Sequence, residues 1–259
     1  MGNTMTDFSL KKWYLDAADE QGNVFIGYWI SLHWRALSLS GYQYLWHSPG
    51  KGVITQSGLM RQPEPVWRNP DCLVWQYKNL NANWKSAADG IEKIIPLNKG
   101  EIGWHCLQPK AKTNIELPQF SFSGWGYTEC MNINVPIWNL PFKTLPWGRA
   151  HSDNHYLVWI KLDGLSKLNI VWYDGKPDNN LVISDTQIRG SNFNLELGEN
   201  IPLRKGEIIS TALQPFKKIT KLFLQKSFLI DEQKWYNRGM LKTDNASEKA
   251  ITIYEKVTW

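Results

Sequence analysis

Residues 95–112, IPLNKGEIGWHCLQPKAK, recur almost unchanged as residues 201–218, IPLRKGEIISTALQPFKK. Eleven of the eighteen positions are identical without a gap, whereas unrelated segments of this length share about one residue. Both copies keep Lys-Gly-Glu and Leu-Gln-Pro, but one has GWHC where the other has ISTA. The repeat predicts two halves of one fold. Its divergent part, which holds Trp104, predicts unequal functions and a pocket built asymmetrically where the halves meet.

Fainter echoes of the same duplication lie upstream of each copy. GYWISL at residues 27–32 resembles LVWIKL at 157–162, and LSGYQYLW at 39–46 resembles KLNIVW at 167–172. Each echo is a short alternating segment followed by a second one, which is typical of a β-hairpin. Because the order is the same in both halves, we expect these hairpins to be part of the duplicated unit.

Strand signals dominate the rest of the chain. NLVISDTQI at residues 180–188, SNFNLEL at 191–197 and AITIYEKVTW at 250–259 alternate apolar with polar residues, which is typical of half-buried strands. Long helical periodicity is missing, and residues 84–94 are a short helix candidate. Many short strands with frequent turns predict barrels or sandwiches, because closure removes exposed sheet edges.

The length of 259 residues, with 42% hydrophobic and 20% charged residues, is globular and long enough for one large or two ordinary domains. Combined with the repeat, it predicts an all-β protein of two tandem β-barrel domains, residues 1–118 and 119–259, joined near residues 113–119. The chain also has 15 Trp, 10 Tyr and 9 Phe. Aromatic rings suit half-polar pockets as well as cores, so we expect some to line a cavity.

Charge and cysteine usage exclude several classes of protein. The net charge is +5, but the densest basic run alternates with apolar residues, as a solvated strand face does. That run comprises Lys217, Lys218, Lys221 and Lys226. We expect no nucleic-acid partner. Three cysteines without a CxxC motif, and no apolar leader or long apolar run, predict a cytoplasmic protein with reduced thiols.

Motifs for metal and cofactor chemistry are missing from the sequence. The five histidines form no HxH or HExxH pattern, and there is no GxSxG motif, phosphate-binding glycine loop or dinucleotide fingerprint. We therefore expect neither a metal nor a cofactor.

Residues 124–152, GWGYTECMNINVPIWNLPFKTLPWGRAHS, are the densest unusual stretch. Irregular backbone rich in functional side chains is often a site. A plain crossover between the domains, with tryptophans that only pack, is the alternative.

Three motifs carry a resemblance to a known superfamily. GWGYTE at residues 124–129, the PxWxLPxxxLPWGR run at 136–149 and the C-terminal YEKVTW resemble lipocalin-like carotenoid 1,2-hydratases (hydroxyneurosporene synthases) and AttH-like proteins. Tocopherol cyclases and fungal Diels–Alderases are more distant members. The resemblance covers chiefly the second half. It implies two lipocalin-like β-barrels and the handling of a hydrophobic, often isoprenoid, substrate.

Hydrating or cyclising an alkene requires an acid that protonates carbon. A carboxylic acid kept neutral by a dry pocket can do this. Asp174, at the end of the IVWY segment, is the position that the resemblance matches to the proton donor, although Asp-Gly is also a common hairpin turn. Glu129 is the second candidate, since strand alternation puts it on one face with Tyr127. A buried ion pair between Glu129 and Arg149 is the alternative.

The resulting cation needs aromatic faces around it. Trp147 and Trp172 are the candidates, with Trp138 behind them, although core packing is the alternative for each. Arg149 could orient a polar head group through its planar fork. His151 could carry protons or simply pack.

The leading hypothesis is a cofactor-independent hydratase or cyclase acting on a small hydrophobic substrate, an isoprenoid or polyene, with peripheral membrane contact for substrate pick-up. A non-catalytic carrier needs only shape and apolar lining. A pericyclase would fold a polyene in the cavity without a strong acid.

Overall fold

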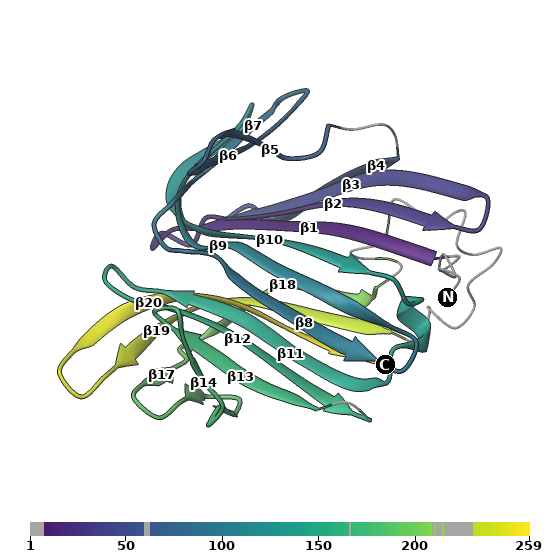
Figure 1. Cartoon of the computed structure of the whole chain (residues 1–259). Helices are drawn as coiled ribbons and strands as arrows, with labels where there is room; N and C mark the ends of the chain where they lie inside the picture. Colours follow the sequence, from purple (N-terminus) through teal and green to yellow (C-terminus); the bar gives the residue numbers. More distant parts are fainter. Residues whose placement is uncertain (1–7, 60–62, 166, 209, 211–213, 215–229) are drawn as a thin grey trace.

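The computed structural model describes residues 8–59, 63–165, 167–208, 210, 214 and 230–259. Within them the chain forms two antiparallel sheets of ten strands each, with one short 3₁₀ helix, η1 (Ile137–Asn139), between the sheets. Figure 1 shows the sheets stacked, with β1 and β10 facing β11 and β20. The predicted all-β fold of two tandem domains is confirmed.

The first sheet has the path β4-β3-β2-β1-β10-β9-β7-β6-β5, with β8 paired to β9. Its strands are β1 (Phe8–Ala18), β2 (Val24–Trp34), β3 (Leu37–Ser48), β4 (Gly52–Leu59), β5 (Val66–Asn69), β6 (Cys72–Tyr77), β7 (Leu80–Ser86), β8 (Ile91–Leu97), β9 (Gly100–Leu117) and β10 (Phe120–Ile133). The helix candidate at residues 84–94 is wrong. Those residues form the end of β7, a turn and the start of β8.

The second sheet repeats this path strand for strand, as β14-β13-β12-β11-β20-β19-β17-β16-β15 with β18 paired to β19. Its strands are β11 (Phe142–His151), β12 (Tyr156–Gly164), β13 (Leu168–Tyr173), β14 (Lys176–Asp178), β15 (Val182–Ile183), β16 (Gln187–Arg189), β17 (Asn194–Glu196), β18 (Asn200–Glu207), β19 (Asp231–Lys242) and β20 (Ser247–Thr258). The two upstream echoes lie in β2 and β12 and in β3 and β13, so the predicted duplication is confirmed.

The chain passes from one sheet to the other within residues 134–141. β10 pairs with both β1 and β9 and therefore belongs to the first sheet. The predicted division at 118/119 instead coincides with the hairpin turn between β9 and β10. A turn signal alone does not distinguish a hairpin from a domain boundary, because only pairing assigns a strand to a sheet.

The repeated segment has different surroundings in the two halves. In the first copy, Lys-Gly closes the β8–β9 hairpin, where Leu97 pairs with Gly100. In the second copy, Gly206 lies inside β18 and pairs with Glu232 of β19. Both glycines have positive φ, 130° and 144°, a conformation that favours glycine. Most of the remaining second copy, and the lysine run at 217–226, lie outside the described residues.

Apolar residues form three clusters. One fills the curl of the first sheet, one fills the curl of the second, and the largest lies between the sheets and takes residues from both. No helix among the described residues has the length and apolar composition needed to cross a membrane.

Candidate functional site

A cavity of about 120 Å³ lies between the two sheets. Its apolar walls come from both halves and include Leu10, Ile30, Ile102, Met131, Ile133, Phe142, Leu145, Ile160, Leu162 and Val257. Five further lining residues, Lys12, Trp104, Glu129, Trp147 and Glu255, form what we call the polar end. The pocket is thus built where the halves meet, as the repeat predicted.

Along β1 and β10, the apolar lining residues lie near the ends of the strands, and the residues of the polar end lie closer to the strand centres. On β1 and β10, Leu10 pairs with Ile133, Lys12 with Met131 and Tyr14 with Glu129. Side chains two residues apart face the same side of a sheet. This row therefore leads from an apolar rim to Glu129, whose side chain is almost fully buried.

The carboxyl group of Glu129 accepts two hydrogen bonds on one oxygen. Trp104 Nε1 and Tyr127 Oη both donate to Oε2, each at 2.6 Å. Burial raises the pKa of Glu129 above its ordinary value, while the charge of Lys12 and these two hydrogen bonds act in the opposite direction. The prediction that Tyr127 and Glu129 share a face is confirmed.

Glu255, the other carboxylate of the polar end, is ion-paired. The ammonium of Lys234, which is fully buried, contacts Glu255 and lies 3.8 Å from Glu232 Oε1. Three aromatic rings surround this ammonium, with centroids at 4.7 Å for Tyr14, 5.6 Å for Tyr28 and 5.7 Å for Trp147. Glu255 therefore serves as a counter-ion.

Arg149 pairs with Asp16, not with Glu129. Its Nη2 donates to Asp16 Oδ1 at 2.6 Å, its Nε at 3.1 Å, and its Nη1 donates to the carbonyl oxygen of Ile251. Both side chains are fully buried. The alternative of an ion pair between Glu129 and Arg149 is therefore wrong, because the partner of Arg149 comes from β1 across the sheet interface.

His151 packs rather than facing the cavity. Its Nε2 lies 2.7 Å from the carbonyl oxygen of Pro109. Burial and the nearby Arg149 charge lower the pKa of His151 well below its ordinary value, so it is neutral at neutral pH. Neither His151 nor Arg149 lines the cavity.

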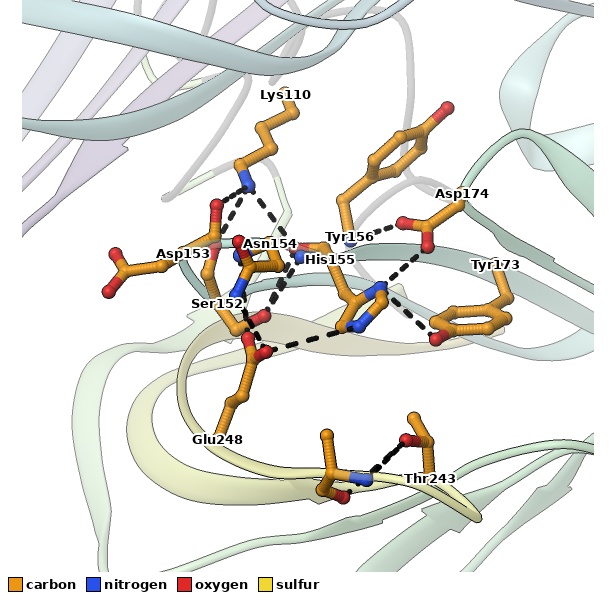
Figure 2. Close-up of polar contacts among 11 residues, drawn as sticks. Lys110, Ser152, Asp153, Asn154, His155, Tyr156, Tyr173, Asp174, Thr243 and Glu248 are labelled. Carbon is orange, nitrogen blue, oxygen red and sulfur yellow. Dashed lines mark hydrogen bonds and ion pairs between the residues drawn. The ribbon is translucent and has the colours of Figure 1, made fainter.

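Asp174 occupies the hairpin turn between β13 and β14, and Figure 2 shows its carboxylate directed toward His155 and the backbone of Tyr156. Asp174 and Gly175 have φ of 48° and 78°, as the two central residues of a type I′ turn require. The Asp174 carboxylate accepts a hydrogen bond from the backbone N–H of Tyr156 at 2.9 Å and lies 2.7 Å from His155 Nδ1. It does not line the cavity. The backbone angles and contacts of Asp174 are those expected of a hairpin-turn residue.

The candidate tryptophans occupy three different places. Trp147 lines the cavity. Trp172 stacks behind the cavity-lining Trp104, with ring centroids 5.1 Å apart. Trp138, in η1, packs edge-on against Phe8 and Trp34 away from the cavity. The structure thus brings Glu129, Tyr127, Trp104 and Trp147 together and leaves the other predicted site residues outside.

Sequence reasoning missed Lys12, Asp16, Lys234 and Glu255. A signal existed for Lys12, because it shares the inward face of FSLKKWYLD with Leu10 and Tyr14, where a charged residue is unexpected. Asp16 carries the same signal. Lys234 and Glu255 lie in ordinary alternating segments, and only strand pairing reveals that they are buried. Among the described residues, no group of three His, Cys, Asp or Glu side chains could hold a metal ion.

Comparison with known proteins identifies relatives by structure only. No family model and no curated sequence matches the chain. An AttH candidate from Nitrosomonas europaea superposes with a TM-score of 0.60 at 9% identity, over 99% of this chain and 94% of that one. CghA gives 0.56 at 10% identity over 96% and 88%, and it was also solved with Sch210972.

Kievitone hydratase from Nectria haematococca gives a TM-score of 0.55 at 8% identity, over 99% of this chain and 90% of that one. Identities this low show a shared fold alone. The resemblance inferred from the GWGYTE and LPWGR motifs is thereby confirmed at the level of architecture, and the chain has the lipocalin-like fold of these proteins.

Proposed function

We propose that this protein is a cofactor-independent enzyme that protonates a C=C bond of a hydrophobic isoprenoid or polyene in the cavity between its sheets. Water addition or ring closure then completes the reaction. Glu129 is the acid. The observation that carries the proposal is a buried carboxyl group at the inner end of an apolar cavity, with its pKa raised by burial.

The hydrogen bonds of Glu129 favour proton transfer from one defined atom. Trp104 and Tyr127 both donate to Oε2, so the neutral acid carries its proton on Oε1. Transfer of that proton to an alkene carbon leaves a carbocation and an ionised Glu129. A water molecule that adds to the cation returns one proton to Glu129, and ring closure with proton loss does the same. The acid is therefore regenerated in each cycle.

Aromatic faces stabilise the intermediate cation. Trp104 and Trp147 line the same cavity as the acid, and a desolvated cation–π contact contributes about 2 kcal/mol or more. The ionised Glu129 adds electrostatic attraction at the moment the cation forms. Apolar walls limit the access of bulk water, which favours controlled capture.

The fold comparison supports a catalytic role in general. One protein of the same fold is named a hydratase of kievitone, and another was solved with Sch210972 bound. The predicted peripheral contact with membranes stays a prediction.

Deuterium uptake tests the proposal directly. Purified protein is incubated in D₂O with kievitone, geraniol and a linear polyene, and products are analysed by mass spectrometry for carbon-bound deuterium. We expect Glu129→Gln to reduce deuterium-labelled product about 10²- to 10⁴-fold, because glutamine keeps the shape but carries no acidic proton. Asp174→Asn is the matched carboxylate control and is expected to retain wild-type turnover.

Three results would contradict the proposal. Glu129→Gln as active as the wild type removes Glu129 as the acid. Conversion without carbon-bound deuterium indicates a pericyclic reaction instead. Binding of the whole panel with no conversion indicates a carrier.

A further inference from the structure

Lys12 is the cation among the charged side chains that line the polar end of the cavity, which is otherwise apolar. It extends inward from β1, and its ammonium lies 5.3 Å from the ring centroid of Tyr28 and 5.9 Å from that of Tyr14. Its neighbour Lys11 faces the opposite side of the strand and pairs with Glu64. Alternation along β1 therefore gives two adjacent lysines different surroundings.

The other charges near the polar end are already paired. Lys234 neutralises Glu255, and Glu232 lies between Lys234 and Arg204, whose Nη1 is 3.7 Å from Glu232 Oε2. Lys12 forms no ion pair with any residue that the structure describes. In the part of the chain that the structure describes, these groups pair with one another, and none of them forms an ion pair with Lys12.

Glu129 is the carboxyl group that remains to balance Lys12. The charge of Lys12 favours the ionised form of Glu129, against the effect of burial. Proton donation requires the neutral form. When Glu129 is neutral, the positive charge of Lys12 in the cavity is uncompensated, and a buried uncompensated charge is unfavourable.

We propose that Lys12 binds the carboxylate head group of an amphiphilic substrate, and that this binding loads Glu129 with its proton. The inference rests on the proposed function for the role of Glu129 as acid. The substrate's apolar chain lies against the aliphatic walls, and its carboxylate replaces Glu129 as the counter-ion of Lys12. Anion binding therefore favours the uptake of a proton from solvent by Glu129.

The chemical class follows from the donor and the space. A lysine ammonium is a compact point charge that pairs with an anion. Because the rest of the cavity is small and mostly apolar, a carboxylate is the anionic head group that we propose for it. The cavity volume of about 120 Å³ is somewhat below that of a cavity that holds benzene, about 150 Å³, so it encloses only a few carbons of an isoprenoid tail.

Binding measurements test Lys12 without requiring turnover. Geranic acid and geraniol share one isoprenoid chain and differ in the head group, and their affinities are measured by isothermal titration calorimetry. We expect geranic acid to bind the wild type about 10- to 100-fold more tightly than geraniol, as a charge-assisted contact predicts. Lys12→Met should remove this preference and leave geraniol binding unchanged. Lys11→Met, the matched control, should keep it.

The coupling to Glu129 has its own readout. Titrations of geranic acid in two buffers of different ionisation enthalpy, at pH values between about 5 and 8, report protons taken up on binding. We expect uptake in the wild type, and none in Glu129→Gln, which should still bind geranic acid. Absence of uptake in the wild type would overturn the coupling.

Equal affinity of the wild type for geranic acid and geraniol, or no binding of either, would overturn the proposal that Lys12 binds a carboxylate. A preference that survives in Lys12→Met would do the same. If Lys12→Met does not fold, as judged by circular dichroism, the wild-type comparison and Lys12→Arg, which should keep the preference, decide the point. Carboxylate binding by Lys12 and proton donation by Glu129 are tested separately, because deuterium uptake can be lost in Glu129→Gln whether or not Lys12 selects carboxylates.

Discussion

Glu129 and Glu255 lie on equivalent strands of the two halves but have different surroundings. Each lies on the last strand of its sheet, β10 or β20, and each faces the first strand, where Glu129 pairs with Tyr14 and Glu255 with Trp147. Their other neighbours differ. Glu129 pairs with Cys106 of β9, whereas Glu255 pairs with Lys234 of β19. A neutral neighbour leaves one glutamate with a raised pKa, and an ammonium makes the other a counter-ion.

The duplication also supplies both partners of the buried ion pair. Asp16 lies two residues after Tyr14 and pairs with Tyr127, and Arg149 lies two residues after Trp147 and pairs with Ile253. They meet across the interface because the two sheets pack through equivalent strands. The two halves therefore share a strand arrangement and differ in the charged side chains that it carries.

Removing the buried ammonium of Lys234 should have the largest effect on stability. Lys234→Met leaves Glu255 buried without its cation, and breaking a buried pair costs about 3–5 kcal/mol of unfolding free energy. Urea denaturation measures it. Lys242→Met, on the same strand but in an exposed pair with Glu196, should cost less than about 1 kcal/mol. Equal losses in the two variants would contradict the assignment of Lys234 and Glu255 as a buried pair.

Substitutions of Trp147 and Trp172 should have the next largest effects and should differ in how much they lower turnover. Trp147→Leu removes a cavity-lining ring and is expected to lower turnover about tenfold, in line with a cation–π contact of 1–2 kcal/mol. Trp172→Leu removes a ring that only backs Trp104 and should change turnover much less. Steady-state kinetics on any substrate that incorporates deuterium measures both. A larger loss in Trp172→Leu would exchange their roles.

The pH dependence of stability should sharpen the comparison with the smallest signal. The folded-state pKa of Glu129 is raised above its ordinary value of 4.5. At pH values between 4.5 and the raised folded-state pKa, the folded protein holds a proton that the unfolded chain has released, so the free energy of unfolding falls as pH rises. Glu129→Gln lacks this loss. Urea unfolding across pH should therefore show the wild type losing stability relative to Glu129→Gln as pH rises above 4.5, whereas a constant difference would contradict a raised pKa.

Local patterns predicted the scaffold well. The near-identical 95–112 and 201–218 segments and the upstream echoes indicated a duplicated all-β fold, because alternation and turn residues are local properties. Glu129 and Tyr127 were placed on one face by the same rule. The Asp-Gly signal of residues 174–175 was equally local, and the structure has the turn that this dipeptide favours.

The sequence by itself determined most of the strands and the duplication, since these depend on side-chain period and turn chemistry within a few residues. Only the tertiary structure decided which charges became partners. Asp16 meets Arg149, and Lys234 meets Glu255, through strand pairing and sheet packing between segments far apart in the chain. The protonation of a buried carboxyl depends on the charges and the desolvation around it, and these neighbours exist only after the two halves have packed together.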